Sequence, residues 1–157
     1  NNVKKIIEGY IINKNQYPLI IIGILQDTNY VKGLLKIKNE NVYFVGGIYN
    51  KYELEVVRSN AFSYFHGHSV GGTNPSLLEA MASRNICVCH DNEFNRGVVS
   101  DSGFYFNTIK DVSDIIKVIE RNDYSHYGNA VFEKVNNYFN WVNIVKLYAD
   151  YFKYITK

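Results

Sequence analysis

Residues 66–82 have the sequence HGHSVGGTNPSLLEAMA, and this stretch decides the fold of the chain. It follows an apolar run at residues 61–65 that predicts a strand, and it passes through two adjacent glycines into a helix pattern. Asn74 is a favoured N-cap residue, and Pro75 is favoured at the first position of a helix. The stretch therefore predicts a strand, a glycine turn and a helix start in succession.

The start of this helix predicts a binding site for an anion. Backbone N–H groups in the first turn of a helix are unpaired, and the helix dipole adds partial positive charge there. Glu79 lies one turn into the helix, where its carboxylate can accept hydrogen bonds from sugar hydroxyls. Phosphate and sugar recognised side by side favour a nucleotide or a nucleotide-sugar as the ligand.

Short apolar runs alternate with helix patterns along the whole chain. Strands are predicted at residues 19–23, 42–45, 61–65, 86–89 and 104–106, and helices at residues 3–13, 28–37, 51–59, 75–84, 111–120 and 141–155. This alternation predicts an α/β fold, a Rossmann-like three-layer αβα sandwich around a parallel sheet. We expect the run at residues 19–23 to be a buried strand. Glycine-bearing loops follow three strands, the third at residues 90–103, and all three should open at the edge of the sheet where ligands bind.

The composition fits one domain spanning residues 1–157. The net charge of +2 gives no electrostatic reason to expect nucleic acid as a partner. No apolar run approaches the roughly 18–20 residues that span a bilayer, and no signal peptide is visible, so we expect a cytoplasmic protein. Cys87 and Cys89 lie two apart in a predicted strand, which indicates small buried residues in a reducing compartment. A metal site that includes Cys89 and His90 is the alternative.

Several motifs resemble one family of enzymes. They are GGTNPSLLEAMA within residues 66–82, VYFVGGI at 42–48, DNEFNRGVV at 91–99, GFYF at 103–106, and FNW followed by a long helix. Because of these motifs, the chain resembles the C-terminal, donor-binding half of retaining glycosyltransferases that have the two-lobed GT-B fold. More narrowly, it is similar to the rhamnosyltransferase-like branch that builds bacterial surface polysaccharides such as lipopolysaccharide and capsule.

The resemblance implies a role for each part of the central motif. Glu79 would bind the ribose of the nucleotide, and the loop that contains Gly71, Gly72 and Thr73 would contact the diphosphate. The ligand would be a nucleotide-diphosphate-sugar, a substrate rather than a cofactor, and no metal ion would be required. Backbone N–H groups, the helix dipole and basic side chains would stabilise the departing diphosphate.

Two further segments would meet the donor. Gly47 and Ile48 would lie near the base, and Asn95 and Arg96 would face the donor from the loop after the next strand. Gly97 stands where this branch tends to have a glutamate, which removes one carboxylate from that loop.

The chain departs from the family pattern beside the sugar. Gly71 stands where the wider family often has a glutamate that touches the donor sugar, and Asn74 stands where a glycine is usual. Sugar recognition would then come from His68, Asn74 or the loop at residues 91–99. His66 and His68 share a face if the strand continues through them, so either one contacts phosphate or sugar, or both are structural.

The family's C-terminal lobe begins with a strand and a basic patch, whereas this chain begins in or just before the following helix. We therefore expect a fragment of a longer two-lobed enzyme, inactive alone, whose N-terminal lobe binds a glycan or lipid-linked acceptor. The full-length enzyme would be peripheral at the inner face of the membrane. The first strand normally lies in the middle of the sheet, so either two strands close its place or another chain fills it, for example by self-association.

The alternative is a non-catalytic, flavodoxin-like module that senses nucleotides or binds another protein. Such an interaction module would expose an apolar patch and show no dependence on nucleotides. The aromatic stripe of the last helix, which includes Trp141, Tyr148, Tyr151 and Phe152, is expected to pack in a core or against another lobe.

Overall fold

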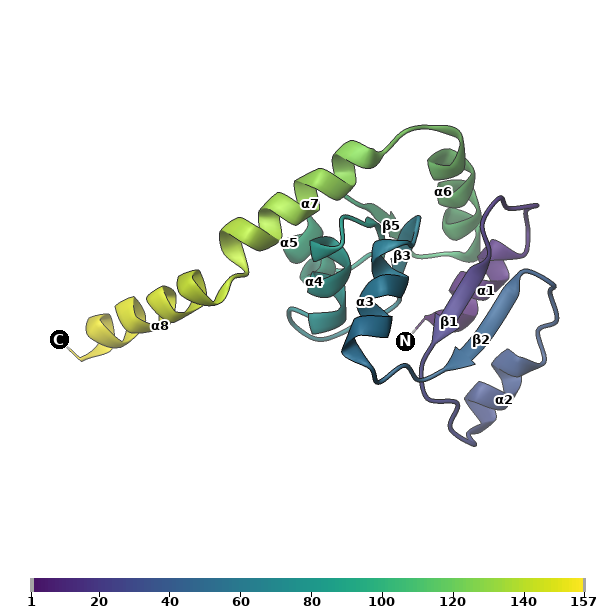
Figure 1. The fold of residues 1–157 in the computed structure, drawn as a ribbon, viewed down its shortest axis with the longest axis horizontal. Helices are drawn as coiled ribbons and strands as arrows, with labels where there is room; N and C mark the ends of the chain where they lie inside the picture. Colours follow the sequence, from purple (N-terminus) through teal and green to yellow (C-terminus); the bar gives the residue numbers. More distant parts are fainter. Residues whose placement is uncertain (1, 157) are drawn as a thin grey trace.

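The computed structural model describes residues 2–156 and has an α/β fold (Figure 1). Every predicted strand and helix is present close to its expected bounds. The strands are β1 (Leu19–Ile22), β2 (Val42–Gly46), β3 (Ser63–His66), β4 (Ile86–His90) and β5 (Phe104–Phe106). The helices are α1 (Val3–Tyr10), α2 (Asn29–Leu35), α3 (Lys51–Ser59), α4 (Pro75–Ala82), α5 (Glu93–Val99), α6 (Ile109–Arg121), α7 (Ser125–Tyr138) and α8 (Trp141–Ile155).

Strand β4 shows the three layers of the fold most clearly. Ile86 and Val88 pack in one cluster with side chains of α1 and α6. Cys87 and Cys89 point to the opposite face and pack in a second cluster with α4, α5 and α7. Helices therefore cover both faces of this parallel strand, which confirms a Rossmann-like αβα arrangement. Both cysteines are free and buried, as predicted for small core residues.

The sheet itself is divided into two parts. β1 pairs with β2, and β3, β4 and β5 form a separate sheet in that order, with all pairs parallel. β1 and β3 do not pair with each other, so the expectation that two strands close the place of a central strand is wrong.

The predicted strand at residues 19–23 is present as β1, but the expectation that it is buried is wrong. Ile20 is 48% exposed, and Tyr43, its register partner on β2, is 49% exposed. Paired residues of parallel strands lie on the same face of the sheet. Their exposure shows that no described helix covers this face of the two-stranded sheet.

Two helices were not predicted. The segment at residues 90–103, expected to be a loop, contains α5, which begins at the N-cap Asn92. Helix α7 has Gly128 and several asparagines, which weaken the helix pattern. It is stabilised by tertiary contacts, because Gly128 lies against the backbone of Arg84 and Val131 is buried in the core.

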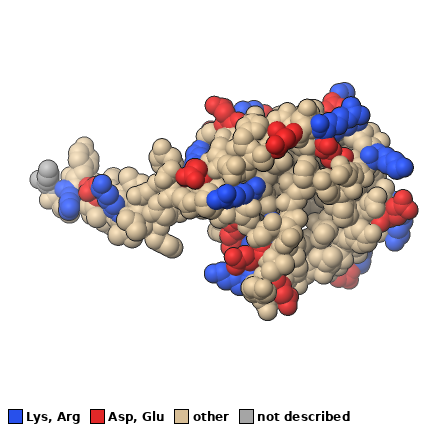
Figure 2. Space-filling model, turned by 45° about the horizontal axis from the view of Figure 1, so that its top comes forward, with Lys and Arg blue, Asp and Glu red and all other residues tan. Residues whose placement is uncertain are grey.

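Helix α8 extends away from the rest of the molecule as an arm (Figure 1). The expectation that its aromatic stripe packs in a core is wrong for the described chain, since Trp141 is 79% exposed and Tyr148, Tyr151 and Phe152 are all exposed. The space-filling view in Figure 2 shows the arm as mostly uncharged surface with a few charged side chains. Among residues 2–156, no helix combines the length and apolar character that crossing a bilayer requires.

Candidate functional site

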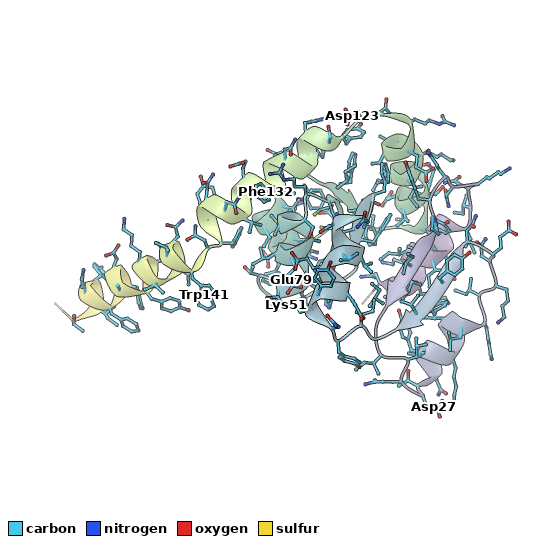
Figure 3. All side chains as sticks on the ribbon, in the orientation of Figure 1. Asp27, Lys51, Glu79, Asp123, Phe132 and Trp141 are labelled. Atoms are coloured by element: carbon cyan, nitrogen blue, oxygen red, sulfur yellow. The ribbon has the colours of Figure 1, made fainter. Side chains whose placement is uncertain are left out.

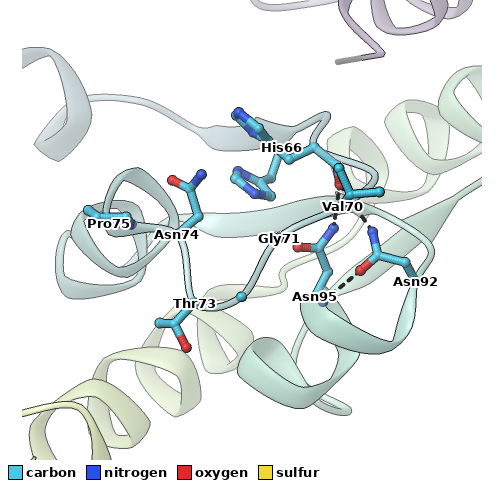
Figure 4. A pocket seen from close by; sticks show the side chains of 10 residues that line it. His66, Val70, Gly71, Thr73, Asn74, Pro75, Asn92 and Asn95 are labelled. Atoms are coloured by element: carbon cyan, nitrogen blue, oxygen red, sulfur yellow. Dashed lines mark hydrogen bonds between the residues drawn. The ribbon is translucent and has the colours of Figure 1, made fainter.

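A small pocket lies where β3 and β4 end, and we call it the loop pocket (Figure 4). Its volume is about 130 Å³. The residues that line it come from the end of β3, the loop before α4 and the start of α5: His66, His68, Val70, Gly71, Gly72, Thr73, Asn74, Pro75, Asn92 and Asn95. Seven of the eleven predicted site residues are therefore brought together here, and Val70, Pro75 and Asn92 are additional members.

The loop before α4 presents free backbone N–H groups. Gly71 has φ of +111°, a conformation that favours glycine, and the whole stretch from Val70 to Thr73 is exposed. The amides of Gly71, Gly72 and Thr73 donate no hydrogen bond to any described residue. They are therefore available to an anion in the pocket.

The first turn of α4 differs from the prediction of unpaired amides. The side-chain oxygen of Asn74 accepts a hydrogen bond from the backbone amide of Ser76 at 3.0 Å. The backbone carbonyl of Asn74 accepts one from the amide of Leu77 at 3.1 Å. Pro75 has no N–H group. Asn74 is thus the N-cap, as predicted, but it uses the amides that were expected to meet the ligand. The free amides lie in the preceding loop, and the helix contributes its dipole.

His66 is a buried polar residue of the pocket that lacks a full set of hydrogen-bond partners. It is only 1% exposed, and its Nε2 has no hydrogen-bond partner among the described residues. Its ring stacks on that of His68 with 4.7 Å between centroids, and its Nδ1 lies 3.5 Å from the hydroxyl of Tyr64. Burial, with a smaller effect of His68, lowers the pKa of His66 to about 4. Burial also lowers the pKa of His68.

Both shifts favour the neutral form of the imidazole rings. An anion beside them would favour the protonated form of either ring. The unpartnered Nε2 of His66 could then donate a charge-assisted hydrogen bond to an oxyanion. The pocket therefore combines free amides with a histidine pair that can gain positive charge.

Asn95 holds the pocket together from α5. Its Nδ2 donates to the carbonyls of His68 at 3.0 Å and His90 at 2.8 Å, and its backbone amide donates to the Asn92 side chain at 2.9 Å. Asn92 also donates to the His68 carbonyl, at 3.1 Å. Asn95 is buried, so its structural contacts fix the loop after β3 against the end of β4. Asn92 was missed, although an asparagine three residues before Asn95 is a recognisable N-cap signal.

Arg96 lies outside the loop pocket. Its guanidinium forms an ion pair with Asp91, in which Nη2 lies 2.9 Å from Oδ2. The guanidinium carbon also lies over the ring of Tyr105, 4.3 Å from the ring centroid. The hydrogen bonds from Arg96 lower the pKa of Asp91. Gly47 and Ile48 also lie outside the pocket, because they follow β2 in the other sheet.

Glu79, whose position on α4 is labelled in Figure 3, does not line the loop pocket either. Its Oε2 lies 2.7 Å from Nη2 of Arg58, which comes from α3. The Glu79 side chain is 54% exposed, and its Oε1 has no partner among the described residues. One carboxylate oxygen is therefore accessible to a ligand that extends beyond the pocket.

No group of three or more His, Cys, Asp or Glu side chains within residues 2–156 is arranged to hold a metal ion. Comparison with known proteins identifies no family that matches the chain, and no curated protein matches it. Fold and site together define an αβα domain of the Rossmann-like type with an anion-sized pocket where two of its strands end.

Proposed function

We propose that the loop pocket binds the diphosphate of a nucleotide-sugar. The observation that carries the proposal is that three unpaired loop amides line the same pocket as a buried, unpartnered histidine. The buried Nε2 of His66 is costly unless an anion or water satisfies it. The three amides belong to an exposed stretch, so an anion can reach them. The resemblance of residues 66–82 to donor-binding lobes supports a diphosphate rather than another anion.

The size of the pocket limits what it holds. Sites that enclose a drug-sized ligand measure roughly 300–1,000 Å³. At about 130 Å³, the loop pocket accommodates phosphate groups, so the nucleoside and the sugar would extend outside it. Glu79, whose side chain is half exposed and pairs with Arg58 through Oε2 only, is the residue we assign to the ribose.

We infer that the chain is the donor-binding lobe of a retaining glycosyltransferase of bacterial surface polysaccharide synthesis. The described residues that line the loop pocket are neutral polar, histidine and apolar side chains, and we assign the pocket to the stabilisation of negative charge. The amides of Gly71, Gly72 and Thr73 and the dipole of α4 would stabilise the departing diphosphate, and a protonated His66 would add to that effect. The acceptor would be a glycan or lipid-linked molecule bound by a second lobe.

One observation favours the second candidate, a module that binds another protein. The exposed apolar side chains of α8, Trp141 and Tyr148 among them, form the kind of patch that marks an interaction site. The two candidates differ in their dependence on nucleotides. A donor lobe binds nucleoside diphosphates, whereas a pure interaction module does not.

The deciding experiment is a titration of the chain with pyrophosphate, UDP, GDP, TDP and ADP. The available contacts are few, and each hydrogen bond to a charged group contributes roughly 1.5–3 kcal/mol. We therefore expect a Kd in the high-micromolar to millimolar range for the preferred nucleotide. The absence of binding by every one of these ligands at about 10 mM would reject the proposal.

Glu79→Gln separates the ribose contact from the phosphate contact. We expect it to weaken nucleotide binding about 5- to 30-fold, equivalent to about 1–2 kcal/mol, and to leave pyrophosphate binding unchanged. Glu93→Gln, at an exposed position in α5, is the matched control and should change neither. Equal losses for nucleotide and pyrophosphate would contradict the assignment of Glu79 to the ribose.

A further inference from the structure

A chain of hydrogen bonds connects the N-cap of α4 to the buried histidine of β3. Asn74 and His66 both line the loop pocket (Figure 4), and two side chains outside the pocket, Ser76 and Tyr64, lie between them. Oδ1 of Asn74 accepts from the Ser76 hydroxyl at 2.7 Å, and that hydroxyl accepts from Tyr64 at 3.0 Å. The Tyr64 oxygen in turn lies 3.5 Å from Nδ1 of His66. We call these contacts the Tyr64 chain.

Each step of the Tyr64 chain has only one possible direction. The backbone N–H of Ser76 donates to Oδ1 of Asn74 at 3.0 Å, which identifies that atom as the amide oxygen, an acceptor only. The Ser76 hydroxyl gives its one hydrogen to this oxygen, so it can only accept from Tyr64. Burial raises the pKa of Tyr64, so its hydroxyl hydrogen is present at neutral pH and is given to Ser76. The Tyr64 oxygen can then only accept from His66, which places an N–H at Nδ1.

A neutral imidazole has one N–H group and one nitrogen lone pair. With the hydrogen on Nδ1 of His66, the lone pair is on Nε2, the buried ring nitrogen that has no partner among the described residues. We propose that Tyr64 is a positioning residue that holds the hydrogen of His66 on Nδ1, so that Nε2 accepts a hydrogen bond and the loop pocket selects an anion with a hydrogen on one of its oxygens. This rests on the anion site proposed above and specifies the form of phosphate that the site takes.

Phosphate and sulfate differ in the property that this arrangement would recognise. Both ions are tetrahedral, but at neutral pH phosphate keeps a hydrogen on at least one oxygen, whereas all four oxygens of sulfate only accept. A P–O–H group can donate to Nε2 of His66 while the other oxygens accept from the amides of Gly71, Gly72 and Thr73. Sulfate would place a lone pair against that of Nε2 or require a protonated ring, which burial opposes. In a nucleoside diphosphate the terminal phosphate carries such a hydrogen near neutral pH, so it is the group we assign to His66.

The first test needs no ligand. Long-range ¹H–¹⁵N NMR spectra at about pH 7 show which ring nitrogen of His66 carries the hydrogen, and we expect Nδ1 in the wild type. Tyr64→Phe removes the acceptor and should give a mixture of the two neutral forms. Ser76→Ala frees the Tyr64 hydrogen to point at Nδ1 and should move the ring hydrogen to Nε2, while the backbone N–H at position 76 still caps α4. Tyr105→Phe is the matched control, because the Tyr105 hydroxyl packs beside the same core cluster but donates to the Ser100 carbonyl.

The second test is a titration of each protein with inorganic phosphate and with sulfate, followed through the amide signals of Gly71, Gly72 and Thr73. We expect the wild type and Tyr105→Phe to bind phosphate at least about 10-fold more tightly than sulfate. In Ser76→Ala the ring can donate from Nε2, so this preference should disappear or reverse.

The two tests overturn different parts of the proposal. A hydrogen on Nε2 in the wild type, or one that stays on Nδ1 in both Tyr64→Phe and Ser76→Ala, would overturn the role of Tyr64. Equal affinity of the wild type for phosphate and sulfate would overturn the selection of the anion. Failure of phosphate, sulfate and every nucleotide to bind would reject the proposed function and the selection together, whereas the NMR result on the empty pocket would still decide the role of Tyr64.

Discussion

The protonation of His66 should make the fold sensitive to mild acid. The pKa of this residue is about 4 in the folded protein and about 6.5 in the unfolded chain. Between these values the unfolded chain binds a proton that the folded protein excludes. The free energy of unfolding therefore falls as the pH falls through this window, and the contribution of His66 is complete above about pH 6.5.

The size of the effect follows from the shift in pKa. A difference of about 2.5 units, at about 1.36 kcal/mol per unit, gives about 3 kcal/mol over the whole window. About 2–3 kcal/mol of this should be lost between pH 7 and pH 4.5. That is a large fraction of the roughly 5–15 kcal/mol that stabilises a typical domain. Carboxylates with lowered pKa, such as Asp91 and Asp111, lose their contribution mainly at lower pH.

The assay is urea denaturation followed by circular dichroism at several values between pH 7 and pH 4.5. The wild type should lose about 2–3 kcal/mol more than His66→Gln, because Gln does not titrate. His126→Gln is the matched control, since His126 is exposed on α7 and does not line the loop pocket. Parallel profiles for the wild type and His66→Gln would refute the reasoning.

The same residue connects stability to the proposed ligand. An anion in the loop pocket raises the pKa of His66, so pyrophosphate binding should take up protons. Calorimetry in buffers of different ionisation enthalpy measures that uptake. We expect proton uptake by the wild type and a smaller uptake by His66→Gln at pH 6. Identical uptake by the two proteins would mean that His66 does not face the anion.

Three further predictions concern the rest of the fold. Gly128→Ala places a Cβ against the carbonyl oxygen of Arg84 and should destabilise the protein by about 1–3 kcal/mol in urea denaturation. Gly97→Ala, in open space on α5, should instead stabilise it by up to about 1 kcal/mol. Burial raises the pKa of Cys87 to about 12, so a thiol reagent at pH 8 should label it only as fast as the protein opens. Acrylamide should quench the single tryptophan, Trp141, nearly as well as free indole; strong protection would show that α8 is covered in solution.

The elements that the sequence predicted best are those with strong local signals. The helix at residues 51–59 has the bounds predicted for it, because Asn50 caps it through its side chain. The helix after the double glycine begins at Pro75 for the same local reason. Local capping is encoded in a few adjacent residues, so it can be recognised without knowledge of the tertiary structure.

Elements that depend on distant contacts could not be predicted in this way. Helix α7 contains Gly128, which lowers its intrinsic propensity, and it forms where the absence of a side chain lets it approach Arg84. The pairing of the first-turn amides of α4 with Asn74 was also missed. A good N-cap satisfies the same groups that an anion would need, so the stronger the capping signal, the weaker the case for a ligand at that turn.

The candidate site shows the same division between local and distant information. The predicted site residues between His66 and Asn74 do line one pocket, because they lie close together in one short stretch of the chain. Gly47 and Ile48 were predicted to join them on the assumption of one continuous sheet, in which the carboxyl ends of all strands share an edge. The structure instead pairs β2 only with β1, in a sheet separate from the one formed by β3, β4 and β5. Gly47 and Ile48 follow β2, whereas the loop pocket lies where β3 and β4 end. A strand pattern predicts that these segments are strands, but it does not predict which strands pair, so this part of the site could not be predicted from the sequence.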